Sequence, residues 1–205
     1  MKRFILISLI IGLCAGQSFA AMDPFINGSF EIGDDPGKSF STLLAGSTAI
    51  DGWTVGNNGI DYISGYWKAA DGSRSLDMSA LNAGSISQTF DTVTGNNYLV
   101  TFQMAGNPVG GPLVKELTVG AAGKSQNFIF DTTGKSQTNM GWETMNFSFV
   151  ANSSSTTLSF TSLINTACGP ALDGVTVSLV PVPATILLGF IGLGVGGWKL
   201  RKSMK

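Results

Sequence analysis

The stretch Asn-Tyr-Leu-Val-Thr-Phe-Gln-Met, which runs from Asn97 to Met104, places an apolar side chain at every second position. A period of two puts alternate side chains on opposite faces of an extended chain, so this pattern predicts a β-strand with one buried face. The same kind of alternation recurs at residues 85–90, 127–130, 145–149, 156–160 and 172–179. The middle of the chain is therefore expected to be a series of short strands.

Clusters of turn-forming residues separate these runs, as in Thr94 to Asn97 and Gly106 to Pro108. Short strands divided by such turns, with no amphipathic helical stretch between them, predict an antiparallel β-sandwich rather than a parallel sheet. No internal repeat or linker interrupts the series. We therefore expect an all-β fold with one sandwich domain over residues 21–180, bounded by the turn before Pro181.

The composition excludes several kinds of chemistry. The chain has 205 residues, no histidine and two cysteines. Without an imidazole, Ser-His-Asp and Cys-His nucleophile pairs are excluded, and two cysteines cannot form a four-thiolate zinc site. Six of the twelve bases lie at the chain ends, whereas all thirteen acids lie between Asp23 and Asp173. Because this acidic middle would repel a phosphate backbone, we expect no nucleic-acid partner.

The first 20 residues have the order of a secretory signal peptide. Lys2 and Arg3 precede an uncharged apolar run from Phe4 to Ala15, and small residues stand three and one positions before a cut after Ala20. A basic start, an apolar run and a small-residue cleavage site are the three parts of such a signal. The run is also too short to span a bilayer comfortably. We predict that residues 1–20 direct export and are removed.

The C-terminal segment, residues 181–205, begins inside a proline-containing motif and continues into an uncharged run at residues 186–198. The motif consists of Val180, Pro181, Val182, Pro183, Ala184 and Thr185. Its prolines oppose helix formation, whereas the apolar run predicts a single, short transmembrane helix. The bases that follow it favour retention of the tail on the cytoplasmic side of the membrane. They are Lys199, Arg201, Lys202 and Lys205.

This three-part tail resembles the PEP-CTERM sorting signal of exopolysaccharide-producing Gram-negative bacteria, except that Val182 stands where the commonest form has glutamate. The resemblance implies processing by an exosortase-type sorting enzyme. It also implies passage through the inner membrane, transient anchoring there by the C-terminal helix, and a final place at the cell surface or in the extracellular matrix.

Six motifs follow one another through the middle of the chain. They are Asn27 to Glu31, Gly52 to Val55, Asp61 to Trp67, Asp71 to Asp77, Gly84 to Phe90 and Gly169 to Val175. Together they resemble the choice-of-anchor C family, relatives of plant cell-wall proteins, and more loosely carbohydrate-binding jelly rolls. The resemblance covers residues 25 to about 180. It implies a galactose-binding-like jelly-roll fold and a surface location, and the family has no well-established reaction.

Two carboxylates at opposite ends of the domain form a candidate metal site. In related carbohydrate-binding jelly rolls, the motifs that correspond to Glu31 and Asp173 bring the first and last strands together around a structural calcium ion. Calcium accepts six to eight oxygen ligands in irregular geometry, so carboxylates and loop carbonyls together suffice. The alternative is that Glu31 and Asp173 accept hydrogen bonds from neighbouring backbone amides. The resemblance thus implies a structural calcium cofactor.

One short stretch carries a candidate glycan site. Aromatic side chains stack on the apolar face of a sugar ring, while charged side chains bond its hydroxyl groups. The alternative is that Tyr62 and Trp67 fill the core, while Arg74 pairs with Asp71 or Asp77. The candidate ligand-binding residues are Tyr62, Tyr66, Trp67, Asp71, Arg74 and Asp77.

These patterns favour an exported, non-catalytic protein whose domain binds extracellular polysaccharide. A structural biofilm or envelope protein that makes only protein contacts is the first alternative, and a glycan hydrolase is the second. Exposure of Tyr66 and Trp67 in a groove favours sugar binding, and their burial favours the structural role. A pair of carboxylates with raised pKa in a cleft favours the hydrolase. Because no motif specifies a hydrolytic carboxylate pair, we expect no enzyme activity.

Overall fold

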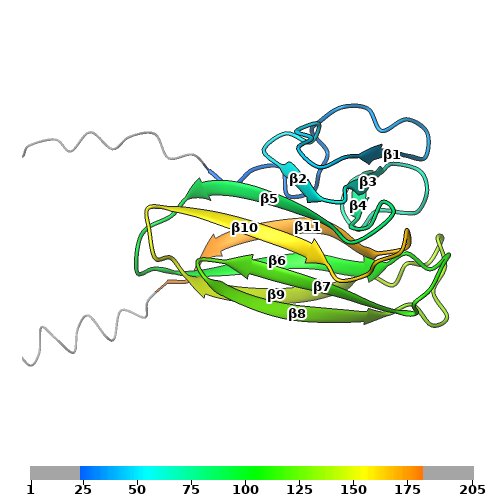
Figure 1. Ribbon diagram of the computed structural model, residues 1–205. Helices are drawn as coiled ribbons and strands as arrows, with labels where there is room; N and C mark the ends of the chain where they lie inside the picture. Colours follow the sequence, from blue (N-terminus) through cyan, green and yellow to red (C-terminus); the bar gives the residue numbers. More distant parts are fainter. Residues whose placement is uncertain (1–23, 182–205) are drawn as a thin grey trace, which may run out of the picture.

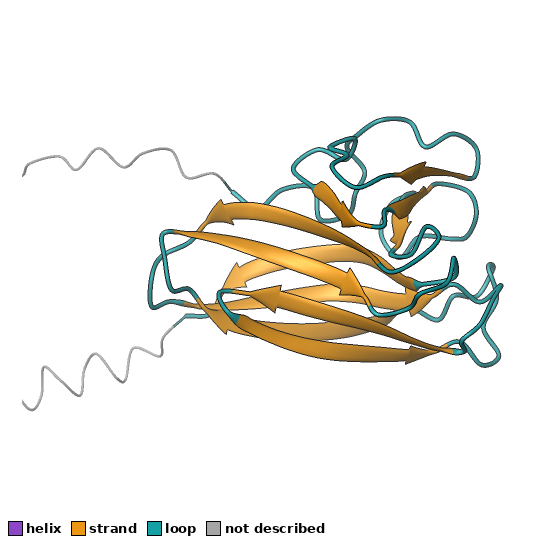
Figure 2. Cartoon of the chain, viewed as in Figure 1, coloured by secondary structure: helices purple, strands orange, loops and turns teal. Residues whose placement is uncertain are grey.

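The computed structural model describes residues 24–181 and places eleven β-strands, and no helix, in that range (Figures 1 and 2). The strands are β1 (Phe40–Leu43), β2 (Thr54–Asn57), β3 (Ile60–Ile63), β4 (Ser75–Asp77), β5 (Gly84–Asp91), β6 (Asn97–Gly106), β7 (Val114–Ala121), β8 (Lys124–Asp131), β9 (Glu143–Val150), β10 (Ser155–Ser162) and β11 (Pro170–Leu179). Figure 1 shows the long strands β5 to β11 as the body of the molecule, with the short strands β1 to β4 gathered to one side.

The strands form two sheets that pack face to face. One has six strands in the order β1-β3-β4-β11-β6-β9, and the other has five in the order β2-β5-β10-β7-β8. Every pair of neighbouring strands is antiparallel. The predicted all-β antiparallel sandwich is therefore confirmed for the part of the chain that the structure describes.

Several sequence predictions lie outside the described residues. They are the signal peptide at residues 1–20, the motif residues Val182 to Thr185 and the transmembrane helix. Val180 is described, and its backbone amide donates to the Asn97 carbonyl at 2.8 Å, which ties the start of the motif to β6. Between residues 24 and 181 we find no helix with the length and apolar character needed to cross a membrane.

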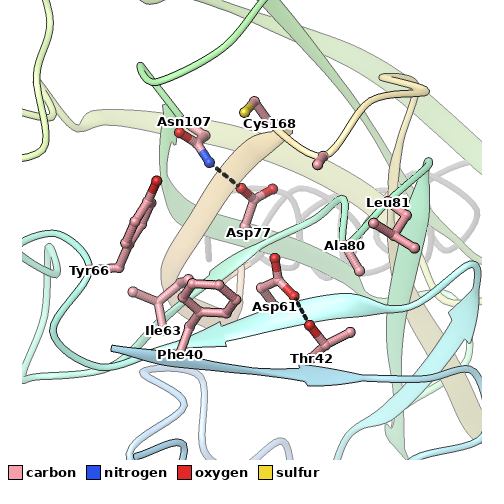
Figure 3. A pocket seen from close by; sticks show the side chains of 11 residues that line it. Phe40, Thr42, Asp61, Ile63, Tyr66, Asp77, Ala80, Leu81, Asn107 and Cys168 are labelled. Atoms are coloured by element: carbon pink, nitrogen blue, oxygen red, sulfur yellow. Dashed lines mark hydrogen bonds between the residues drawn. The ribbon is translucent and has the colours of Figure 1, made fainter. Parts of the chain in front are cut away.

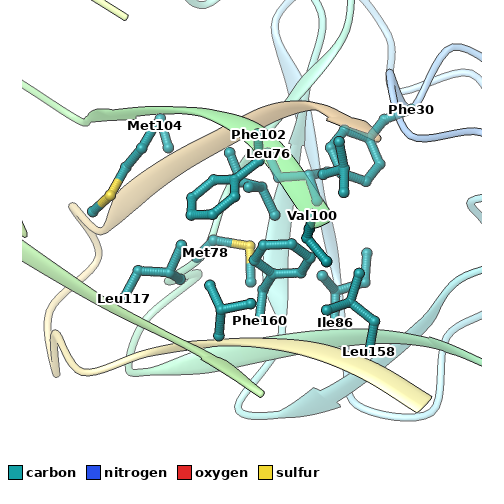
Figure 4. Packing of buried hydrophobic residues seen from close by; sticks show 14 of the residues in the cluster. Phe30, Leu76, Met78, Ile86, Val100, Phe102, Met104, Leu117, Leu158 and Phe160 are labelled. Carbon is teal, nitrogen blue, oxygen red and sulfur yellow. The ribbon is translucent and has the colours of Figure 1, made fainter. Parts of the chain in front are cut away.

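The alternating residues of β6 build the centre of the core (Figure 4). Val100, Phe102 and Met104 are fully buried between the sheets. The Phe102 ring packs edge-to-face against Phe128 of β8 and Phe160 of β10, with centroids 5.1 and 5.3 Å away. Such aromatic pairs add to the hydrophobic gain, so replacing Phe102 by alanine would cost about 3–5 kcal/mol. The apolar face predicted from the period-two pattern is the face that the sheets enclose.

The opposite, outer face of the six-stranded sheet carries polar residues in register. Asp61 of β3 pairs with Thr42 of β1 on one side and with Asp77 of β4 on the other, and Asp77 pairs with Ala171 of β11. Side chains of paired residues share a face, whereas the adjacent Leu76 points into the core. The strand pattern thus puts two aspartates side by side on the outside of the sandwich.

The loop between β3 and β4, residues 64–74, lies over this outer face. Its Trp67 Nε1 donates to Ser75 Oγ at 2.8 Å, and its backbone amides at Ala70 and Asp71 donate to the Asp173 carboxylate. Because Ser75 and Asp173 stand on the same face as Asp77, these bonds hold the loop against the sheet. We call residues 64–74 the β3–β4 loop.

Candidate binding site

A cavity of about 330 Å³ opens on the outer face of the six-stranded sheet (Figure 3). Strands β1, β3 and β4 form its floor, and the β3–β4 loop and the segments after β4, after β6 and before β11 form its walls. It is lined by Phe40, Thr42, Asp61, Ile63, Tyr66, Asp77, Ala80, Leu81, Asn107, Ala167 and Cys168. In Figure 3 the two aspartates lie between Tyr66 and Phe40 on one side and Ala80 and Leu81 on the other.

Asp61 is buried but only partly bonded. Its side chain is 8% exposed, and Thr42 Oγ1 donates to its Oδ1 at 2.6 Å. Within residues 24–181, no other hydrogen bond to this carboxylate is found, and Figure 3 shows the second oxygen on the side of Asp77, among the residues that line the cavity. Desolvation raises the pKa of Asp61, and the bond from Thr42 offsets only part of that rise. The carboxylate therefore retains an acceptor for a ligand.

Asp77 is fully bonded. Its Oδ1 accepts the backbone amides of Ser79 and Gly169, both at 3.0 Å, and its Oδ2 accepts Asn107 Nδ2 at 2.8 Å. Desolvation is the largest influence and raises its pKa to about 7, and the neighbouring charge of Asp61 adds to the rise, whereas the three donors oppose it. Asp77 thus joins β4 to the segments after β6 and before β11, and its carboxyl group forms part of the cavity wall.

Two aromatic rings stand at the rim of the cavity. Tyr66, from the β3–β4 loop, is half-buried, and Phe40, at the start of β1, is 43% exposed. Their rings pack edge-to-face, with centroids 5.5 Å apart and planes at 73°. An exposed aromatic edge next to carboxylate, amide and hydroxyl groups is the mixture of apolar and polar contacts that suits a small polar ligand.

The remaining aromatic candidates from the sequence lie in the interior. Tyr62 is fully buried and its hydroxyl donates to the Phe30 carbonyl, while Trp67 is 4% exposed and its indole nitrogen donates to Ser75. Their burial corrects the assignment of both rings as sugar-stacking surfaces, because neither presents a face to solvent. Their burial agrees with the alternative interpretation, in which Tyr62 and Trp67 fill the core.

The charged candidates are also distributed differently from the prediction. Arg74 donates to the Tyr62 hydroxyl at 2.7 Å and to the Gly33 carbonyl at 3.3 Å, and not to Asp71 or Asp77, the partners that the alternative interpretation gave it. The Asp71 side chain is exposed, and its backbone amide is the group that bonds Asp173. Of the six predicted glycan-binding residues, the cavity includes Tyr66 and Asp77.

Glu31 anchors the end of the β3–β4 loop. Its Oε1 accepts the backbone amides of Ser73 and Arg74, both at 2.7 Å, and its Oε2 accepts Ser73 Oγ at 2.8 Å. Partial desolvation raises the pKa of Glu31, but these bonds and the Arg74 charge prevail and lower it. Gly72 is required beside this carboxylate, because its φ is +65° and a Cβ would lie 2.5 Å from Oε1.

Asp173 anchors the middle of the same loop. It is fully buried, and its Oδ2 accepts the backbone amides of Ala70 and Asp71 at 2.8 and 2.9 Å. Its Oδ1 accepts the amide of Gly174, which has a φ of +54° at the bulge that interrupts the pairing of β11 with β6. Desolvation raises its pKa to about 7, although the three amides oppose the rise.

The surroundings of Glu31 and Asp173 do not fit a calcium site. Each oxygen of both carboxylates accepts an N–H or O–H group, and a donor hydrogen occupies the place that a cation would need. The part of the chain from residue 24 to residue 181 contains no group of three or more carboxylate or cysteine side chains that could hold a metal ion. Calcium binding stays a prediction, and the geometry is that of the alternative, in which both residues bond backbone amides.

The sequence analysis did not identify the other residues that line the cavity, among them Phe40, Thr42, Asp61, Asn107 and Cys168. The position of Asp61 could have been predicted, because it is adjacent to Tyr62 in a strand and neighbouring strand residues point to opposite faces. The position of Asn107 could not, since its contact with Asp77 joins residues 30 positions apart. Lys115 lies behind the cavity wall, where its Nζ donates to the carbonyls of Gly110 and Cys168 at 2.7 and 2.6 Å.

The fold is that of a β-sandwich module. A solved structure described as TmCBM61 in complex with beta-1,4-galactotriose superposes with a TM-score of 0.50 at 14% identity, covering 77% of this chain and 99% of that one. At this identity the similarity shows the fold alone. The predicted jelly-roll type of sandwich agrees with it.

The sequence model of DUF642, described as a protein of unknown function, matches residues 23–178, and the chain belongs to this family. Halomucin of Haloquadratum walsbyi is 32% identical over 180 residues, covering 84% of this chain and 2% of halomucin. Protein TEEBE of Arabidopsis thaliana is 28% identical over 172 residues, covering 75% of this chain and 45% of that protein. The chain thus spans less than half of the length of either relative.

Proposed function

We propose that this chain is a non-catalytic carbohydrate-binding protein and that its ligand enters the cavity beside Asp61. The single observation that carries the proposal is the pairing of an aromatic rim, Tyr66 and Phe40, with a carboxylate that keeps one oxygen free for a donor. A sugar presents an apolar ring face and several hydroxyl donors, and both kinds of contact are available here. The carbohydrate complex of the structurally similar module supports the same proposal.

The cellular setting is part of this proposal. A choice-of-anchor C protein with a PEP-CTERM tail, read by an exosortase-type enzyme at Val180 to Thr185, would be exported and released to the cell surface or the matrix. Its ligand there would be an exopolysaccharide of a Gram-negative cell. Transient insertion of the C-terminal helix in the inner membrane would precede release.

A second candidate, glycan hydrolysis, is favoured by one observation: Asp61 and Asp77 are neighbouring carboxylates in a cavity, and the pKa of each is raised. Hydrolysis requires both carboxyl groups to reach the scissile bond or its water. Asp77 is 1% exposed, and both of its oxygens accept N–H donors that join three segments of the chain. That bonding suits a structural anchor better than a general acid.

The experiment is affinity electrophoresis of the purified protein through gels that contain one soluble polysaccharide each. Tyr66→Ala removes half of the aromatic rim and should weaken binding up to about tenfold, taking the sugar contact as comparable to an aromatic pair, which contributes about 0.5–1.5 kcal/mol beyond the area it buries. Leu44→Ala, at a 69% exposed residue just after β1 that does not line the cavity, is the matched control and should bind like the parent.

Retardation by no polysaccharide, or equal retardation of parent and Tyr66→Ala, would refute sugar binding at this cavity. Release of reducing ends from a retarding polysaccharide, abolished by Asp61→Asn, would replace the binding proposal with the hydrolytic one.

A further inference from the structure

We propose that the cavity is selective for a sugar unit that carries a protonated amine, and that Asp61 is the residue that determines this specificity. The inference rests on the proposed function, because it names the class of sugar that the same cavity would take. It follows from the charge of the lining, from the bonding of each carboxylate and from the size of the space.

The charge of the lining is negative. Two of the residues around the cavity, Asp61 and Asp77, are acids, and none of them is lysine or arginine. Lys115 lies behind the wall, where it is fully buried, and its ammonium group donates to the carbonyls of Gly110 and of the lining residue Cys168. A sugar acid in this cavity would bring a third carboxylate without meeting a cation, which like-charge repulsion and desolvation both oppose.

The free acceptor is specific to Asp61. A carboxylate that is 92% buried is costly unless its charge is paired or fully hydrogen-bonded, and Thr42 satisfies only one of its oxygens. Asp77 has no comparable free oxygen, because three N–H groups already donate to its carboxylate. A donor that enters the cavity therefore finds its acceptor at the second oxygen of Asp61, which Figure 3 shows on the side of Asp77, among the lining residues.

An ammonium group satisfies this acceptor better than a hydroxyl group does. A hydrogen bond between two charged groups is shorter and stronger than one from a neutral donor, and a cation also offsets the negative charge of the carboxylate. A metal cation fits poorly, because a hard cation needs several oxygen ligands and Asp61 alone has a carboxylate oxygen to spare.

The shape of the cavity favours a ring over a flexible side chain. About 330 Å³ is at the lower end of the range for ligand pockets, so it holds a small unit rather than a long segment of polymer. The edge-to-face pair of Phe40 and Tyr66 borders that space with a rigid apolar contact. We therefore assign the cavity to an amino sugar, with its ring against the aromatic rim and its ammonium group at Asp61.

The test is isothermal titration of the full chain with four oligosaccharides of equal length: glucosamine, N-acetylglucosamine, glucose and glucuronic acid oligomers. At a pH where the amine is protonated, the glucosamine oligomer should bind at least tenfold more tightly than its N-acetylated form, and the glucuronic acid oligomer should bind most weakly. Asp61→Asn keeps an acceptor for Thr42 but lacks the charge, and it should bring the ratio of the two affinities close to one.

The control variant is Glu143→Gln, which removes one exposed carboxylate at the far edge of the same sheet and should keep the tenfold ratio. A ratio near one in the parent protein, or an equal loss of preference in both variants, would overturn the inference and leave sugar binding intact. Binding of no oligomer together with no retardation in any polysaccharide gel would instead refute the proposed function itself. Coincident thermal melts of Asp61→Asn and parent exclude misfolding as the cause of a changed ratio.

Discussion

The two outer faces of the sandwich are built from the same kind of strand but differ in what covers them. On the five-stranded sheet the outward side chains remain in solvent, and they bond to one another, as Thr89 does to Thr157 at 2.8 Å. On the six-stranded sheet the outward residues Asp61, Asp77 and Asp173 are buried. The β3–β4 loop and the segments after β4, after β6 and before β11 make this difference, because they cover part of a polar face that would otherwise be solvated.

The comparison shows that position in a strand does not decide whether a polar residue is functional. An outward threonine on either sheet satisfies itself with a neighbour or with water. A buried outward aspartate must find donors in the segments that cover it: Asp173 accepts two backbone amides of the β3–β4 loop, and Glu31 accepts two more at the end of that loop. The anchors and the site therefore depend on each other, and breaking an anchor should affect the covered face alone.

The largest effect is expected at Asp77. Asp77→Asn places an amide NH₂ against Asn107 Nδ2, so two donors face each other, and we expect a loss of about 3 kcal/mol of unfolding free energy. Adding Asn107→Asp restores an acceptor for the new amide while its other oxygen keeps the bond from the Val109 amide, so the double variant should recover more than half of the loss. Denaturant unfolding measures both.

The matched control for that exchange is Thr89→Ala on the open face, which should change the unfolding free energy by less than about 0.5 kcal/mol. A double variant no more stable than Asp77→Asn would show that the charge of Asp77, rather than its pattern of donors and acceptors, holds the three segments together.

The sequence predicted the inward, core-forming face of the sheets better than the outer face that carries the site. Alternation is a local property, so the inward positions of β6 could be read directly, and the sandwich followed from them. The site depends instead on which residues a loop covers. Tyr62 and Trp67 were assigned to a surface because aromatic and charged residues stand close together in sequence, whereas strand geometry directs Tyr62 inward and the loop folds Trp67 under itself.

The effect of pH is expected to be next in size. Burial raises the pKa of both Asp77 and Asp173 to about 7, so the folded protein binds these protons more tightly than the unfolded chain, whose reference pKa is 3.8. The stabilisation that this gives is fully present below the unfolded pKa and is lost as pH rises through about 7. At about 1.4 kcal/mol per pKa unit, we expect the unfolding free energy to fall between pH 4.5 and 8 by up to about 3 kcal/mol for each carboxylate.

Asp173→Asn cannot titrate and should make that decline shallower, as denaturant unfolding at a series of pH values would record. A rise in stability over the same interval would mean that the amide donors outweigh desolvation at both carboxylates and keep them charged.

The smallest effect is expected at the loop's exposed anchor. Glu31→Gln keeps an acceptor for the Ser73 and Arg74 amides and loses only a charge near Arg74, so it should cost less than about 0.5 kcal/mol. Glu31→Ala leaves two amides and the Ser73 hydroxyl without their acceptor and should cost about 1 kcal/mol, since water can replace part of the bonding at this half-exposed position.

Thermal melts of the parent and both variants, each with calcium and with a chelator, distinguish a Glu31 that only anchors the loop from a Glu31 that binds a metal ion. If Glu31 only anchors the loop, the melting temperature should decrease from parent to Glu31→Gln to Glu31→Ala in both conditions, with no shift on chelation. A metal ligand would instead give a parent that melts lower in chelator and a Glu31→Gln variant that does not respond, because the neutral amide binds calcium weakly. The second pattern would support calcium binding, and it would also mean that an ion at Glu31, rather than the hydrogen bonds from the Ser73 and Arg74 amides, holds the loop on the covered face.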